Sequence, residues 1–94
     1  QLGKEDINEI AKRLLSVLSK RVAELEIGLE FSTEAIEAIG KAGFDPVYGA
    51  RPLRRAIQQR IEDKLSEDML EGKLEPGKNY FCEYADDKFI FIER

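Results

Sequence analysis

Four arginines at the start of one predicted helix are the side chains best placed for chemistry in this sequence. They lie within residues 51–60, with no acidic residue among them: Arg51, Arg54, Arg55 and Arg60. Pro52 suits the first position of a helix, because its missing N–H costs nothing there, and it biases Arg51 toward an extended backbone. Arg51 is therefore expected at a helix N-terminus, where free N–H groups and the helix dipole favour an anion. Its guanidinium adds a planar set of donors suited to phosphate or carboxylate.

Local features alone leave a second interpretation of Arg51 open. A rigid loop followed by a solvated basic helix face is common, and a short motif carries a real risk of a false match. The sequence contains no G-x-x-x-x-G-K-[ST] motif, so it encodes no phosphate-binding P-loop. It also has no apolar strand that ends in Asp-Glu and could hold magnesium.

The remaining polar groups predict neither a catalytic nor a metal site. Histidine is absent and Cys82 is the single cysteine, which excludes histidine-based triads, histidine metal sites and multi-cysteine zinc sites. Cys82 is expected as a small apolar filler within a strand. Asp86 and Asp87 are expected in a turn rather than as a catalytic pair. The isolated domain is therefore not expected to be an enzyme.

The composition predicts one soluble domain over residues 1–94. Hydrophobic residues make up 43% of the chain and charged residues 36%, which is typical of a globular domain. The net charge of −4 disfavours nucleic acid as a partner. No apolar run is long enough to cross a bilayer and no signal segment is evident, so we expect a cytoplasmic setting. Residues 1–3 are expected to be a frayed start or the cut edge of a longer protein.

Apolar periodicity predicts three helices. The first covers 4–26 and ends at Gly28, the second begins after the N-cap Ser32 and ends at Gly43, and the third begins at Pro52. The predicted apolar face of the first helix is Ile7, Ile10, Ala11, Leu14, Val17, Leu18, Val22 and Leu25.

The third helix carries apolar residues at strict steps of four, up to a stop at Gly72: Leu53, Ile57, Ile61, Leu65 and Met69, widened by Ala56 and Leu70. Such a stripe drifts around an α-helix by about 40° per step. The helix is therefore expected to bend, or to pack its two ends on different partners.

The rest of the chain predicts a small sheet. Residues 28–31 and 80–84 alternate like strands, and Asp86-Asp87 makes a tight turn into residues 88–93. The last strand is apolar on both faces, which favours a central position in a three-stranded sheet. The predicted fold class is α+β, with the order helix, strand, helix, helix, hairpin.

Two stretches within the chain resemble one known family. Residues 43–58 read G-F-D-P-V-Y-G-A-R-P-L-R-R-A-I-Q, and residues 61–77 read I-E-D-K-L-S-E-D-M-L-E-G-K-L-E-P-G. They resemble the small C-terminal (lid) subdomain of the second AAA+ module in Clp/ClpB-family ATPases, and the likeness covers nearly the whole chain. The sequence E-D-K-L-S-E is more similar to the ClpC- and ClpE-like branch than to ClpB. One departure is Lys64, where many relatives have proline, which puts a break in the third helix in doubt.

The resemblance implies roles for individual residues in a longer ATPase. Arg51 matches the sensor 2 arginine, which reaches the phosphates of ATP from the small subdomain. Gly49 and Ala50 would let the loop approach the nucleotide, and Ile10 would lie near the adenine. The candidate subunit-interface residues are Asp45, Pro46, Tyr48, Arg54 and Arg55.

The same resemblance implies cofactors and partners. These are ATP or ADP with magnesium in the parent protein, the large AAA+ subdomain of the same chain, neighbouring subunits of a homo-hexamer, client polypeptides and, for some relatives, a ClpP-type peptidase. No nucleotide is expected to bind tightly to the fragment alone, because one arginine without a P-loop lacks most phosphate contacts. Two other interpretations stay open: a stand-alone protein-interaction module, and a small nucleic-acid binder that uses the arginine helix.

Overall fold

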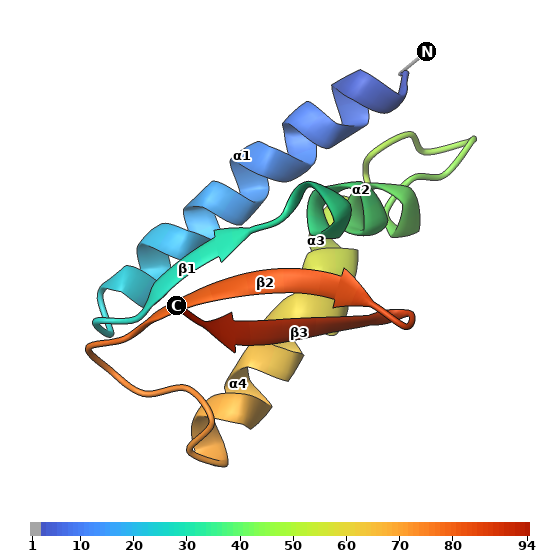
Figure 1. Cartoon of the computed structure of the whole chain (residues 1–94). Helices are drawn as coiled ribbons and strands as arrows, with labels where there is room; N and C mark the ends of the chain where they lie inside the picture. The colour runs from blue at the N-terminus through green and yellow to red at the C-terminus, as the bar shows by residue number, and fades with distance from the viewer. Residues whose placement is uncertain (1–2) are drawn as a thin grey trace.

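The computed structural model describes residues 3–94; Gln1 and Leu2, part of the predicted frayed start, lie outside the described residues. Figure 1 shows helices gathered around a small sheet. The elements are α1 (Lys4–Ala23), β1 (Gly28–Phe31), α2 (Thr33–Ala42), α3 (Leu53–Ile57), the π-helical segment η1 (Gln58–Glu62), α4 (Asp63–Leu70), β2 (Asn79–Ala85) and β3 (Lys88–Glu93). The predicted α+β class and the order of the elements are confirmed.

The sheet has the order β1-β2-β3, with β1 parallel to β2 and β3 antiparallel to it. The prediction that the last strand is central is wrong, because β3 forms an edge and β2 lies in the middle. Phe89 on β3 faces the core and is buried, whereas Ile90 and Ile92 on the other face are 36% and 44% exposed. Apolar residues on both faces of β3 therefore mark one partly exposed sheet face, not a central strand.

The predicted end of the first helix is also corrected. The α1 helix ends at Ala23, because the N–H groups of residues 24–26 each donate to the carbonyl three residues earlier and Glu26 is left-handed, with φ of 64°. Gly28 is the first residue of β1 instead, and a Cβ there would lie only 2.0 Å from Asn79 Oδ1 on β2. This glycine serves strand pairing rather than helix termination.

Most of the predicted apolar face of α1 is confirmed, with two exceptions. Val17 and Leu25 are exposed, and Leu15, which the prediction left out, is buried. Val17 lies off the buried stripe of α1, and Leu25 lies beyond the end of the helix. The buried residues of α1 follow steps of three and four: Ile7, Ala11, Leu15, Leu18 and Val22.

The signals for α2 are confirmed at both ends. Ser32 is the N-cap, and its Oγ accepts a hydrogen bond of 3.0 Å from the N–H of Ala35. Gly43 ends the helix where the start of α3 touches it, since a Cβ on Gly43 would lie 2.7 Å from Leu53 Cα. This contact fixes the two points between which the arginine loop is held.

The segments α3, η1 and α4 follow one another without a break and form one rod (Figure 1). All four of the first apolar residues in the four-residue series are buried: Leu53, Ile57, Ile61 and Leu65. In a regular α-helix the apolar stripe would rotate around the axis, and the π-helical segment η1 offsets this rotation. At its end, the N–H of Asp63 donates to the carbonyl of Gln58, five residues earlier. A turn closed over five residues takes about one residue more than an α-helical turn, so steps of four stay on one side. Leu70, predicted to widen the buried face, is exposed.

The rod ends as predicted, at Gly72. This residue is left-handed, with φ of 77°, and the N–H of Lys73 donates to the carbonyl of Asp68 at 2.8 Å, which is a Schellman closure. The core lies between α1, α2, the rod and the inner face of the sheet, and its largest fully buried side chains come from all of these parts and from Ile27 after α1: Leu15, Ile27, Ile39, Leu53, Ile61 and Cys82. Across residues 3–94, no helix is both long and apolar enough to cross a membrane.

Candidate functional site

The arginine loop, defined here as residues 44–52 between α2 and α3, is tied together by its own hydrogen bonds. The Asp45 carboxylate accepts from the backbone N–H of Val47 at 2.7 Å and of Tyr48 at 3.0 Å. Asp45 and Gly49 also exchange two backbone hydrogen bonds, of 2.8 and 2.6 Å. Gly49 is left-handed, with φ of 65°, a conformation that glycine adopts without strain. The loop is therefore ordered by local contacts before it meets any partner.

The last residues of the arginine loop lead directly into the helical rod. The N–H of Arg51 donates to the carbonyl of Tyr48 at 3.2 Å, and the N–H of Leu53 donates to that of Ala50 at 3.0 Å. Pro52 is helical in φ, at −73°, but it precedes the first helical residue instead of occupying it. Leu53 is fully buried and anchors this end of the rod in the core. Arg51 therefore lies two residues before α3, one residue further from the helix than the sequence predicts.

Arg51 is exposed, and its guanidinium carbon lies 5.8 Å from the centroid of the Tyr48 ring. Within residues 3–94 it forms no ion pair with an aspartate or glutamate. An isolated guanidinium at the start of a helix keeps its N–H donors free for an anion from outside the domain.

Ile10 and Ala50, the other predicted nucleotide-binding residues, are half-buried and pack against the hydrophobic core. Leu14, one turn after Ile10 on α1, lines a groove of about 380 Å³ together with Arg54 of α3. The face of α1 that carries Ile10 is thus brought beside the start of the rod. The proposed placement of Ile10 near an adenine stays a prediction.

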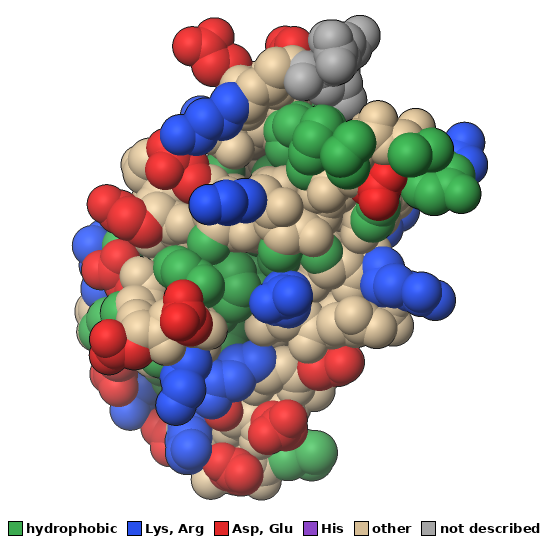
Figure 2. Space-filling model, turned by 90° about the vertical axis from the view of Figure 1, so that its right-hand side faces the viewer, with side chains coloured by type: hydrophobic (Ala, Val, Ile, Leu, Met, Phe, Trp, Pro, Cys, Tyr) green, Lys and Arg blue, Asp and Glu red, His purple; other side chains and the backbone are tan. Residues whose placement is uncertain are grey.

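The candidate interface residues share this end of the molecule, and most of them are exposed: Asp45 (half-buried), Pro46, Tyr48, Arg54 and Arg55. Sequence reasoning missed Val47, which is 81% exposed, and Phe44, which is also exposed. The sequence did hold a signal for Val47, which is an apolar residue between Pro46 and Gly49 in a predicted loop. Figure 2 looks onto the side toward which the loop projects in Figure 1, and shows hydrophobic side chains exposed among basic and acidic ones.

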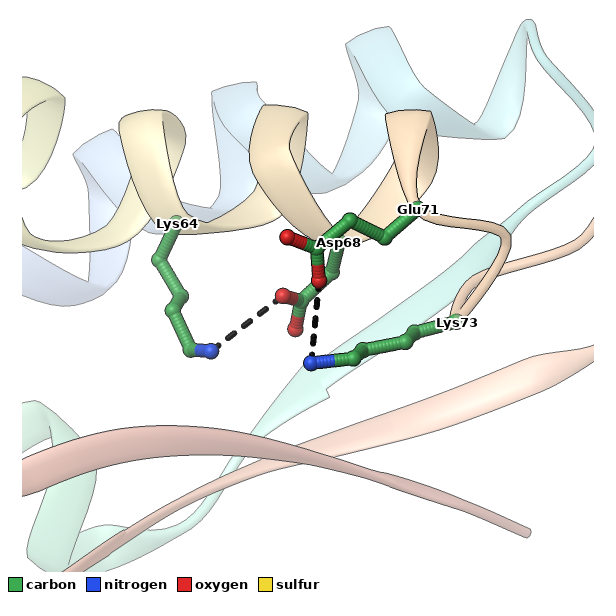
Figure 3. Close-up of polar contacts among 4 residues, drawn as sticks. All are labelled: Lys64, Asp68, Glu71 and Lys73. Atoms are coloured by element: carbon green, nitrogen blue, oxygen red, sulfur yellow. Dashed lines mark hydrogen bonds and ion pairs between the residues drawn. The ribbon is translucent and has the colours of Figure 1, made fainter.

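The polar groups elsewhere have structural roles. Burial, with a smaller effect from Glu83, raises the pKa of Cys82 to about 12, so its thiol is neutral and unreactive at neutral pH. In Figure 3, Lys64 contacts the buried Asp68 at 3.2 Å, and Lys73 contacts Glu71 at 3.0 Å. The hydrogen bond and charge of Glu71 raise the pKa of Lys73. These pairs brace the end of α4, where the chain turns toward the sheet.

A family model described as the C-terminal, D2-small domain, of ClpB protein matches residues 2–82. The chain belongs to this family. It is 51% identical over 85 residues to the chaperone protein ClpB of Vibrio cholerae, a match that covers 90% of this chain and 10% of that protein. It is 46% identical over 86 residues to the chloroplastic chaperone protein ClpD of Arabidopsis thaliana, with 92% and 9% covered.

A third relative is the negative regulator of genetic competence ClpC/MecB of Bacillus subtilis. This D2-small domain is 37% identical to it over 89 residues, which cover 95% of the domain and 11% of that protein. The preference for a ClpC- or ClpE-like branch is therefore not supported, because ClpB relatives match at up to 51%. The domain spans about a tenth of the length of these relatives.

Proposed function

We propose that this D2-small domain is the nucleotide-sensing and subunit-assembly lid of a hexameric, ATP-dependent protein unfoldase. The observation that carries the proposal is Arg51: an exposed guanidinium without an acidic partner in residues 3–94, held on an ordered loop at the start of a long helical rod. Membership of the ClpB D2-small family supports it. The exposed guanidinium fits a nucleotide phosphate, because it presents a planar set of charged hydrogen-bond donors.

In the longer protein, Arg51 would donate to the phosphates of ATP, and magnesium would be held by the large subdomain. Gly49 and Ala50 present no bulky side chain on the approach to the phosphates, and Ile10 would pack near the adenine. An arginine that reaches the terminal phosphate binds the ATP and ADP states unequally. Such a difference in affinity is what a ligand needs to shift the equilibrium between two arrangements of the lid.

The rod would transmit this shift to the rest of the assembly. Leu53, at the start of the rod, is fully buried in the core. A displacement of Arg51 would therefore move the rod and the core together. The exposed candidates Pro46, Arg54 and Arg55, with the half-buried Asp45, would meet the large subdomain or a neighbouring subunit. Client polypeptides and a ClpP-type peptidase would bind to other parts of the longer protein. We propose that the longer protein works in the cytoplasm. In this proposal, ATP hydrolysis takes place in the rest of the longer protein.

A second candidate function is a stand-alone protein-interaction module that does not depend on nucleotide. The exposed Val47 and Tyr48 favour it, since apolar side chains on an ordered loop are suited to a partner's pocket. The two functions differ in their dependence on ATP. A nucleic-acid binder is disfavoured by the net charge of −4.

The test compares ATP turnover and sedimentation of the full-length protein with those of Arg51→Ala. Arg60→Ala is the matched control, because it removes the same charge from an exposed position within η1. We expect Arg51→Ala to lose most of the turnover, or the hexamer's response to ATP, and Arg60→Ala to behave as wild type. Wild-type turnover and sedimentation for Arg51→Ala would contradict the proposal and favour the interaction module.

A further inference from the structure

The loop that carries Arg51 also holds an aromatic ring against it. The guanidinium carbon of Arg51 lies 5.8 Å from the centroid of the Tyr48 ring, within the roughly 6 Å over which a cation is attracted to a ring face. The N–H of Arg51 donates to the carbonyl of Tyr48 as well, so one short turn places both side chains. The contact is therefore built into the backbone of the loop.

The position of the Tyr48 ring is not explained by the core. Tyr48 is 60% exposed, yet its N–H donates to Asp45 Oδ1 at 3.0 Å, and the loop closes around it through the pair Asp45 and Gly49. An exposed tyrosine on an ordered loop adds little to folding stability. Arg51 is the cation that this ring contacts.

We infer that Tyr48 is a positioning residue for Arg51, an inference that rests on the proposed function. A ring attracts a guanidinium without supplying a carboxylate, so the positive charge is kept and the N–H donors stay available for phosphate. An acidic partner would hold the arginine equally well, but it would neutralise the charge and occupy those donors. Tyr48 thus narrows the range of arginine rotamers before nucleotide binds.

The attraction is weak enough to be exchanged for phosphate. Exposed contacts of this type change an equilibrium by about two- to fivefold. Removing the ring is therefore expected to weaken ATP binding by this factor, through Arg51, and to leave the fold intact.

The experiment measures the affinity of the full-length protein for a fluorescent ATP analogue. The variants are Tyr48→Leu, which removes the ring, Tyr48→Phe, which keeps it, and Leu70→Ala, a control that removes an exposed apolar side chain at the end of α4. We expect a two- to fivefold loss for Tyr48→Leu, rescue by Tyr48→Phe, and wild-type affinity for Leu70→Ala. Circular dichroism checks that the variants remain folded. Loss of affinity in Tyr48→Phe equal to that in Tyr48→Leu would overturn the inference, because the hydroxyl group and not the ring would then matter.

A double-mutant cycle with Arg51→Ala separates this inference from the proposed function. If Tyr48 acts through Arg51, Tyr48→Leu has no further effect once Arg51 is alanine. An undiminished effect in that background overturns the inference. If Arg51→Ala weakens binding while Tyr48→Leu does not, the inference alone fails. If Arg51→Ala itself has no effect, the proposed function fails, and the inference fails with it.

Discussion

The contact between the end of α2 and the start of the rod gives the sharpest prediction about stability. In Gly43→Ala, the new Cβ would lie 2.7 Å from Leu53 Cα and 2.6 Å from Leu53 Cδ1, where ordinary contacts begin at about 3.4 Å. The backbone of Gly43 has φ of −97° and ψ of 8°, a negative-φ conformation that is open to alanine, so the conflict is mainly one of space. Leu53 is fully buried and cannot withdraw unless α3 moves.

The cost follows from what must move. Overpacking a core contact typically costs about 1–3 kcal/mol. For a domain of this size, each kcal/mol lowers the melting temperature by roughly 4–8 °C. The variant should still fold, because total stabilities are about 5–15 kcal/mol. The shift of α3 would also displace the arginine loop, whose last residue adjoins Leu53.

The assay is urea unfolding of the 94-residue chain, followed by far-ultraviolet circular dichroism. Gly40→Ala is the control: its Cβ would meet only side-chain atoms, Asn8 Oδ1 at 2.9 Å and Ile7 Cγ2 at 3.3 Å, and these can shift. Alanine also favours the helix by about 0.5–1 kcal/mol over glycine, so this control should be nearly neutral. Wild-type stability for Gly43→Ala would refute the packing that holds the loop.

Three further predictions concern side chains away from that contact. Burial raises the pKa of Cys82 to about 12, so the unfolded chain loses the thiol proton at lower pH than the folded chain, and the free energy of unfolding should fall as pH rises from about 9 toward 12. At pH 8, iodoacetamide should alkylate Cys82 only as the chain unfolds, and rapid labelling of the native chain would contradict the burial. Lys64→Met should lower the free energy of unfolding in urea by about 1–3 kcal/mol, because it removes the ammonium group that lies 3.2 Å from the buried Asp68 carboxylate. An unchanged free energy of unfolding would mean that water solvates this carboxylate. Asp45→Ala should lower the free energy of unfolding by about 1 kcal/mol and speed hydrogen exchange at the backbone amides of Val47 and Tyr48, which donate to the Asp45 carboxylate. Asp45→Asn should keep most of this protection, and equal protection in the wild type and both variants would refute an ordered loop.

Several features could be predicted because local rules decide them. Ser32 caps a helix through its own side chain, and the turn at Asp86 and Asp87 needs two consecutive left-handed residues, which aspartate tolerates. The position of Arg51 before a helix follows from Pro52 in the same way. In these cases the physical cause lies within a few residues of the effect.

The errors share a different origin. The place of β3 at the sheet edge depends on its pairing with β2 and on which face meets the core, and neither is local. The π-helical turn in η1 satisfies the burial of Ile61 against distant residues, so the four-residue spacing signalled a problem but not its solution. For Val47, an apolar residue in a predicted loop was a signal in the sequence, but its exposure depends on how the loop projects from the fold.

The measurement that tests the central claim most directly is the ratio of ATP to ADP affinity in the full-length protein, for wild type and Arg51→Ala. Charge-assisted hydrogen bonds to the terminal phosphate are worth about 1.5–3 kcal/mol. If Arg51 senses that phosphate, the substitution should lower the ATP-to-ADP affinity ratio by about 10- to 150-fold, mainly by weakening ATP binding. An unchanged ratio would show that the arginine does not distinguish the two nucleotides and would contradict the account.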